Sequence, residues 1–313
     1  MSEGKDSAEE GTPSLTVLIP THGRPVLLKQ TLKAVAACSL PDGYRELIVI
    51  ENGSRAGAET IVESLPGRLH ARYMHDSWGN KSNALNKAIG TIDSGLVVFF
   101  DDDVEMHPDT LVSYSTTARE HGPGHFYGGN VRVDREGRFP DGFANKFPAS
   151  TTGYDATDRL GRDGMVFLGF NWATYKEDLD RMGGFNPMLG PGSPIGTSVG
   201  DESELQQRMM KSGMDPVAVP QATVTHHVPA EHTTLRWLLR RTFRVAVFTG
   251  STTSKREQDW MSLLRGLLRA VGVLLKGILL ADKEKVVVSL LSIYRSLGKA
   301  KGYLSRNKLR VRS

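Results

Sequence analysis

Short apolar runs alternate with segments of helical periodicity in roughly the first third of the chain. Three runs consist almost wholly of branched or aromatic apolar residues, which is typical of strands buried on both faces. These predicted strands are residues 15–19, 47–50 and 96–100, with a shorter one at 72–74. The predicted helices between them are residues 24–37, 57–65 and 80–90. This alternation predicts an α/β fold, a mostly parallel sheet with helices on both faces.

Polar clusters stand where the predicted strands end, at residues 21–24, 51–54 and 101–103. In a parallel sheet the carboxyl ends of the strands meet at one edge, and ligands bind there. Asp101, Asp102 and Asp103 directly follow a strongly apolar strand. Adjacent carboxylates repel one another unless a cation neutralises them, and carboxylate oxygens suit Mg²⁺ or Mn²⁺. The cluster therefore predicts a metal site, with a solvated acidic turn as the alternative.

Charge is distributed unevenly along the chain, whose formal net charge is +4. Residues 236–313 contain 18 Lys and Arg against 4 Asp and Glu, whereas the residues before them contain 21 against 31. An acidic body with a basic tail suggests that the tail meets an anionic surface. We expect that surface to be lipid headgroups, and we expect no nucleic-acid partner.

The tail also has an amphipathic pattern. Arg265, Arg269, Lys276 and Lys283 fall on one narrow stripe of a helix, and the rest of residues 263–280 is nearly all apolar. This pattern is typical of a helix lying in a membrane interface, and residues 236–244 add a second basic stretch with Trp237 as an aromatic anchor. The alternative is a helical hairpin packed on the rest of the chain or on a second copy in a homo-oligomer.

Two features bear on the compartment. Residues 1–13 are acidic and polar, so we expect a disordered lead-in without a secretory signal, and no run of about 20 apolar residues predicts a membrane-spanning helix. The single cysteine, Cys38, fits a buried apolar role in a reducing compartment. We therefore expect a cytoplasmic protein, peripheral on the inner face of the cell membrane.

Taken in order, several segments resemble family 2 glycosyltransferases of the GT-A fold. They are residues 17–25, 51–54, 80–90, 99–111, 169–171, 183–185, 201–205 and 226–229. The resemblance covers about residues 15–235 and implies a Rossmann-like catalytic domain at 14–235. Its nucleotide-sugar half would be about 14–130 and its acceptor half about 131–235, followed by the basic helical tail at 236–313.

The resemblance also implies roles for single residues. The nucleotide-sugar contacts would be Pro20, Thr21, Arg24, Glu51, Asn52, Asn80, Asn86, Asp101 and Asp102. Asp103 would be the main metal ligand, assisted by Asp101 and one histidine. Adjacent residues on a strand point to opposite sides, so only one of His226 and His227 faces the site, and we favour His227.

The catalytic base would come from Asp201 and Glu202. Leu205 keeps the family's register, which puts Glu202 on the base position and Asp201 beside it. The assignment between the two stays open, because either carboxylate can reach an acceptor hydroxyl. Both also suit the first turn of a helix, where acidic groups are stabilised by the helix dipole.

These features predict an inverting, metal-dependent glycosyltransferase. It would move a sugar from a UDP, dTDP or GDP sugar to the hydroxyl of a glycan, a lipid-linked saccharide or a small molecule, with Mg²⁺ or Mn²⁺ as cofactor. The alternatives are a Mg²⁺-dependent nucleotidyltransferase and a non-catalytic, membrane-associated binding protein. Every candidate site residue precedes Leu235, so we expect a chain without residues 260–313 to be more soluble and still bind the nucleotide.

Overall fold

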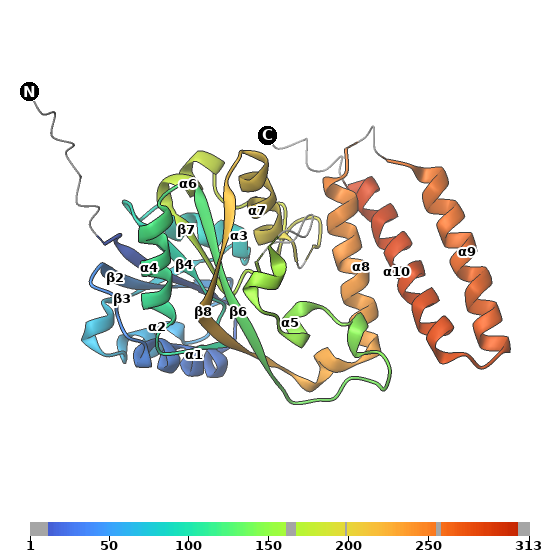
Figure 1. Cartoon of the computed structure of the whole chain (residues 1–313), viewed down its shortest axis with the longest axis horizontal. Helices are drawn as coiled ribbons and strands as arrows, with labels where there is room; N and C mark the ends of the chain where they lie inside the picture. Colours follow the sequence, from blue (N-terminus) through green and yellow to red (C-terminus); the bar gives the residue numbers. More distant parts are fainter. Residues whose placement is uncertain (1–11, 161–166, 198, 255–257, 306–313) are drawn as a thin grey trace, which may run out of the picture.

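A computed structural model describes residues 12–160, 167–197, 199–254 and 258–305. Most of the lead-in expected at residues 1–13 therefore lies outside the described residues. An α/β body built around one sheet lies beside three C-terminal helices (Figure 1).

The sheet has eight strands within the described residues, in the order β3-β2-β1-β4-β7-β6-β8-β5. The strands are β1 (Leu15–Thr21), β2 (Tyr44–Asn52), β3 (Ala71–Asp76), β4 (Leu96–Phe99), β5 (Val104–Met106), β6 (His125–Arg135), β7 (Trp172–Tyr175) and β8 (Asp215–Val228).

Among the described residues, seven α-helices belong to the body and three to the tail. The body helices are α1 (Pro25–Ala37), α2 (Ala58–Glu63), α3 (Lys81–Ile89), α4 (Thr110–His121), α5 (Ala149–Thr152), α6 (Lys176–Met182) and α7 (Asp201–Lys211). The tail helices are α8 (Leu235–Thr252), α9 (Trp260–Leu279) and α10 (Lys283–Ser305).

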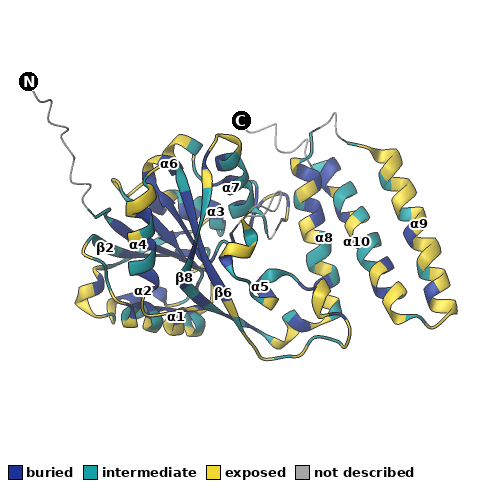
Figure 2. Ribbon diagram, in the orientation of Figure 1, coloured by how far each residue is buried: buried dark blue, intermediate teal, exposed yellow. Residues whose placement is uncertain are grey.

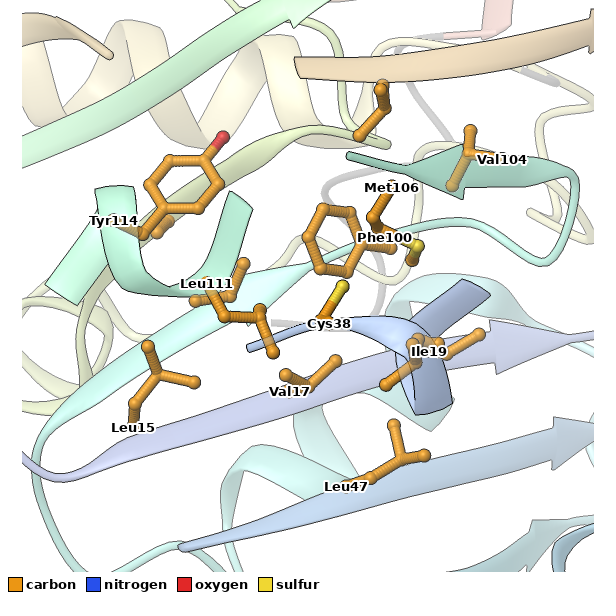
Figure 3. Close-up of a cluster of buried hydrophobic side chains, with 14 of the residues drawn as sticks. Leu15, Val17, Ile19, Cys38, Leu47, Phe100, Val104, Met106, Leu111 and Tyr114 are labelled. Carbon is orange, nitrogen blue, oxygen red and sulfur yellow. The ribbon is translucent and has the colours of Figure 1, made fainter. Parts of the chain in front are cut away.

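The half of the sheet formed by β3, β2, β1 and β4 is wholly parallel, as the apolar runs predict. Leu15, Val17 and Ile19 of β1 pack on one face of the sheet, whereas Leu18 packs on the other, and all four side chains are fully buried. Figure 3 shows the first of these clusters, in which Cys38 lies among apolar side chains as expected. Because both faces are covered, only the strand ends remain available for chemistry.

The other half of the sheet is mixed. β7 runs antiparallel to both β4 and β6, and β5 runs antiparallel to β8. Four of the seven strand pairings are still parallel, so the mostly parallel sheet is confirmed. The antiparallel strands carry the chain back across the sheet, and this return brings the acceptor-half segments beside β4.

The tail is a three-helix arrangement in which α8 lies nearest the body and α9 lies outermost (Figure 1). α8 joins the body through a small core of Phe143, Phe147, Leu238 and Val287. α10 packs against α8 at very short range, because a Cβ built on Gly298 would lie 2.4 Å from the carbonyl oxygen of Phe243. A Cβ on Gly302 would lie 2.3 Å from the carbonyl oxygen of Val247.

The structure corrects one expectation for the tail and bears on a second. The helix that carries the basic stripe ends at Leu279, and Lys283 begins α10 after a turn in which Ala281 takes φ 51°, so Lys283 does not extend the stripe. Removing residues 260–313 would also strip α10 from α8, which does not fit the expected gain in solubility. No described helix is long and apolar enough to cross a membrane.

Candidate active site

The acidic cluster follows β4 at the carboxyl edge of the parallel strands. Asp102 is fully buried and accepts a hydrogen bond from the hydroxyl of Thr21 (2.6 Å) at the end of β1. The guanidinium of Arg24 pairs with Asp102 and, at 2.8 Å, with Oδ2 of Asp103. Asp102 thus anchors the β1 turn, Asp103 shares Arg24 with it, and Asp101 pairs with Lys81 instead.

A cavity of about 420 Å³ opens at this edge. Five of the residues expected to contact the nucleotide sugar line it, namely Pro20, Thr21, Arg24, Asn52 and Asp101. The sequence reading missed His22, Gly79, Lys81, Pro191 and Gly192, which complete the lining. A larger cavity of about 550 Å³ lies among residues at the opposite strand ends and contains none of the predicted site residues, so we take the smaller one as the donor cavity.

Four residues expected at the donor do not line this cavity: the buried Asp102, whose partners are given above, and Glu51, Asn80 and Asn86. Glu51 is buried, and its carboxylate accepts hydrogen bonds from Ala56 N and from the hydroxyl of Tyr73. Asn80 caps α3 by accepting from Asn83 N, and its amide donates to the carbonyl of Pro187. Asn86 exchanges two hydrogen bonds with the backbone of Phe185 (all distances 2.6–2.9 Å). The side chains of Glu51, Asn80 and Asn86 therefore hold neighbouring segments of the fold in place and do not face the donor cavity.

Lys81 links the two halves of the site. Its ammonium lies 2.7 Å from Oδ1 of Asp101 and 2.7 Å from Oε1 of Glu202, with 13% of the side chain exposed. Burial alone would lower the pKa of Lys81, but the two carboxylates outweigh it and hold the pKa well above its ordinary value. Lys81 is therefore a fixed positive charge between the donor cavity and α7.

Asp201 and Glu202 begin α7 after Gly200. Burial would raise the pKa of Glu202, but Lys81 overrides it and brings the pKa to about 2, so Glu202 is ionised at neutral pH. Burial, together with the neighbouring Glu202, raises the pKa of Asp201 well above its ordinary value. The pKa values of the two acids are thus shifted in opposite directions, and the ionised Glu202 is the better candidate to accept a proton.

Two glycines make room for these carboxyl groups. A Cβ on Gly169 would lie 2.2 Å from Cδ of Glu202, and a Cβ on Gly190 would lie 2.5 Å from Cγ of Asp201. Gly190 also has φ +83°, which L side chains rarely adopt. The segments around residues 169 and 190 therefore fit closely around the acidic pair.

The preference for His227 is corrected by the geometry. Nε2 of His226 lies 3.7 Å from Oδ1 of Asp103, while Nδ1 contacts the carbonyl of Ser150 at 2.7 Å. The ring also stacks on Phe170 with centroids 4.5 Å apart. His227 points to the other side of β8, where Nε2 lies 3.2 Å from Glu136. The alternation of side chains along a strand explains why only one histidine faces the aspartates.

Asp103 and His226 leave a place for a cation. No group of three or more His, Cys, Asp or Glu side chains within the described residues is spaced to hold a metal by itself. Oδ1 of Asp103, however, is buried and accepts no hydrogen bond from any described residue. A buried carboxylate oxygen without a donor is costly unless a cation meets it, so the residues fit a metal that takes its other ligands from substrate and water.

A second cavity, of about 290 Å³, lies on the other side of Lys81 and Asp101. These two residues and Pro191 line both cavities, and Glu202, Asp201 and His226 line the second. Trp237 and Arg241 of α8 also line it, so the tail contributes to the site beyond Leu235. Trp237 stacks parallel to Phe147 (6.5 Å), so its ring packs on the body.

Comparison with known proteins decides the family. Residues 16–183, more than half of the chain, match the family model "Glycosyl transferase family 2". The chain belongs to glycosyl transferase family 2. It is therefore a glycosyltransferase, and the nucleotidyltransferase and the non-catalytic binding protein are set aside.

Two curated relatives belong beside this family 2 enzyme. A GalNAc(5)-diNAcBac-PP-undecaprenol beta-1,3-glucosyltransferase of Campylobacter jejuni is 30% identical over 141 residues, which cover 43% of each chain. The succinoglycan biosynthesis protein ExoM of Rhizobium meliloti is 25% identical over 272 residues, covering 82% of this chain and 81% of ExoM. The chain thus aligns with less than half of the first relative's length.

The fold matches a solved enzyme over nearly its whole length. Mannosyltransferase PcManGT from Pyrobaculum calidifontis, in complex with GDP-Man and Mn²⁺, superposes with a TM-score of 0.60 at 19% identity. The match covers 96% of this chain and 90% of that one, and it confirms the GT-A fold.

We expect Lys81→Met to destabilise the protein at neutral pH by about 3–5 kcal/mol, the usual cost of leaving buried charges without their partner. With Lys81 present, ionised Glu202 stabilises the fold above its unfolded pKa of about 4.3, and this contribution is lost as pH falls toward 2. Without Lys81, burial raises the folded pKa above the unfolded value. The deficit should therefore shrink as pH falls through about 5.

Urea denaturation near neutral pH and near pH 5 measures this difference. Lys285→Met is the matched control, because Lys285 forms an exposed ion pair with Asp282 at 2.8 Å, and its loss should leave the midpoint unchanged. A Lys81→Met deficit that is the same at both pH values would contradict the assigned buried bridge.

Proposed function

We propose that this protein is an inverting, metal-dependent glycosyltransferase that moves a sugar from a nucleotide-diphosphate sugar to an acceptor hydroxyl. The observation that carries the proposal is the shared wall of the two cavities. Asp101 and Lys81 line both, and Glu202 reaches that wall from the acceptor side. A donor sugar in the donor cavity and an acceptor in the second cavity, which we call the acceptor cavity, would meet at this wall.

The residues divide the work as follows. Pro20, Thr21, Arg24, Asn52 and Asp101 hold the nucleotide sugar in the donor cavity. Asp103 and His226 hold the divalent cation, which supplies positive charge to the diphosphate leaving group when bound. PcManGT was solved with GDP-Man and Mn²⁺, which supports a nucleotide sugar and a divalent cation as the molecules bound here, with Mg²⁺ or Mn²⁺ as the cation.

Glu202 acts as the base. It takes the proton of the acceptor hydroxyl while the oxygen attacks the anomeric carbon and the bond to the diphosphate breaks. Its low pKa makes it a weak base, so proton transfer follows the start of bond formation, when the acceptor oxygen has shared electrons with the anomeric carbon and its proton has become acidic. Burial and the neighbouring Glu202 raise the pKa of Asp201, so a second negative charge beside Glu202 is disfavoured.

We further propose that the protein is peripheral on the cytoplasmic membrane face and docks through α9. Most of its exposed apolar side chains, among them Leu264, Leu268 and Leu275, fill an arc of about 100°, and Arg265, Arg269 and Lys276 fill a neighbouring arc of about 40°. α9 is largely exposed (Figure 2), with Leu268 and Leu275 each 63% exposed. An apolar arc bordered by cations complements an anionic lipid surface.

The cation is tested by Asp103→Asn. This change removes the charge that faces His226 but keeps the side chain's size, so donor turnover should fall by at least about 100-fold while the protein stays folded. Release of nucleoside diphosphate from a panel of nucleotide sugars with Mn²⁺ measures it, and circular dichroism controls for folding. Full turnover of the unaltered protein in the presence of a chelator would refute the metal assignment.

The base is tested by Glu202→Gln beside Asp201→Asn. Glu202→Gln should lower transfer by about 100- to 10,000-fold with little change in donor affinity, because the base acts on the acceptor. Asp201→Asn should do less, since Glu202 rather than Asp201 is proposed to take the proton. Transfer rate and nucleotide-sugar binding are measured on both variants; an inactive Asp201→Asn with an active Glu202→Gln would reverse the two roles.

The membrane face is tested by vesicle co-sedimentation. The triple variant Arg265→Gln, Arg269→Gln and Lys276→Gln should lose most binding to anionic vesicles, since each basic group near such a surface contributes about 1 kcal/mol. The matched control replaces the exposed Lys29, Lys33 and Lys211 of the body by Gln and changes net charge equally. Binding that ignores lipid charge and salt, with self-association through α9, would favour the homo-oligomer instead.

A further inference from the structure

A further cavity, which we call the basic cavity, lies between the body and the tail. It has a volume of about 290 Å³ and is lined by residues of α8, α10 and the segment before α5. Four of its ten lining residues are basic, namely Lys146, Arg241, Arg295 and Lys299, and none is acidic. Leu238 and Val245 contribute apolar surface to its wall. The cavity therefore combines concentrated positive charge with an apolar wall.

This positive charge is not neutralised by the protein. Among the described residues, none of the four basic groups forms an ion pair with a carboxylate within 4.0 Å. The guanidinium of Arg241 lies over the ring of Trp237 (5.4 Å to the centroid), and the ammonium of Lys299 lies near the ring of Tyr303 (5.7 Å). Cations gathered without counter-charges repel one another, so an anionic ligand would stabilise the arrangement.

Arg241 connects this cavity to the acceptor cavity, because it lines both. Glu202 lies in the acceptor cavity, and its charge is felt by Arg241. A ligand whose anionic group sits on the basic side of Arg241 would therefore direct its neighbouring hydroxyl-bearing part toward Glu202. The planar guanidinium suits phosphate oxygens, to which it can donate two hydrogen bonds.

We propose that the basic cavity binds the phosphate or diphosphate group of a lipid-linked acceptor, with its first apolar units against Leu238 and Val245. The proposal rests on the proposed function, since it names the class of acceptor for that site. A neutral glycan would leave the four cations without a partner, and a nucleotide sugar has its own cavity on the other side of Lys81. The volume fits a headgroup rather than a whole lipid.

Binding of geranyl diphosphate, measured by calorimetry on the full chain without metal and with the donor cavity saturated by nucleoside diphosphate, tests this site. The double variant Arg295→Gln and Lys299→Gln should weaken binding at least tenfold, because both changes remove cations and neither residue lines the donor or acceptor cavity. The matched control, Arg236→Gln with Lys283→Gln, removes two exposed charges from the same two helices and should leave binding unchanged.

Further probes separate the sources of the anionic group. Geraniol should not bind, and inorganic diphosphate should bind at least tenfold more weakly than geranyl diphosphate. Equal binding of inorganic diphosphate would overturn the lipid-linked acceptor in favour of a free anion, and equal competition by dihexanoyl phosphatidylglycerol would overturn it in favour of bilayer headgroups. Equal loss in the control variant would overturn the site itself. Because the readout is binding, intact binding without sugar transfer would count against the proposed function and leave the cavity standing.

Discussion

One buried ammonium group holds the two halves of the site together. Lys81 stands at the start of α3, and its two carboxylate partners come from the end of β4 and from the first turn of α7. The backbone repeats the connection, because Lys81 N donates to the carbonyl of Pro191 and the hydroxyl of Ser82 donates to the carbonyl of Leu189. The start of α3 is thus tied to the loop that leads to α7, and the position of Glu202 follows from that tie.

The acidic residues at this edge are kept apart in function by their surroundings rather than by their chemistry. Asp102 is bound to Thr21 and Arg24, Asp101 to Lys81, and Asp103 faces His226 with one oxygen free of hydrogen bonds. A chain of alternating charges of this kind lets several carboxylates share a small volume without mutual repulsion deciding their states. Of the three described aspartates after β4, Asp103 is the one with a buried oxygen that accepts no hydrogen bond, which leaves it for an external cation.

The parallel half of the fold was predictable because its strands are apolar on both faces, a signal that depends on the local sequence alone. β6 and β7 were not predicted from the sequence. β6 ends in polar residues and β7 has only four residues, so neither shows a continuous apolar run, and their pairing depends on distant segments. Within the site, Thr21, Arg24 and the aspartates follow from strand ends. Lys81 lies in a predicted helix without a local signal of its role, because that role depends on Glu202, 121 residues away. Asn80 and Asn86 illustrate the converse, since polar side chains near a site also serve the fold.

The close contact of α8 and α10 affects the site as well as the stability of the tail. α8 provides Trp237 and Arg241 to the acceptor cavity, and α10 fixes α8 through backbone contacts that only glycine permits. The catalytic part of the chain therefore does not end where the sheet ends, because it includes residues of α8. A chimaera that kept the sheet but took helices α8, α9 and α10 from another protein would also replace Trp237 and Arg241. Exchanging these helices would therefore change the lining of the acceptor cavity as well as the tail.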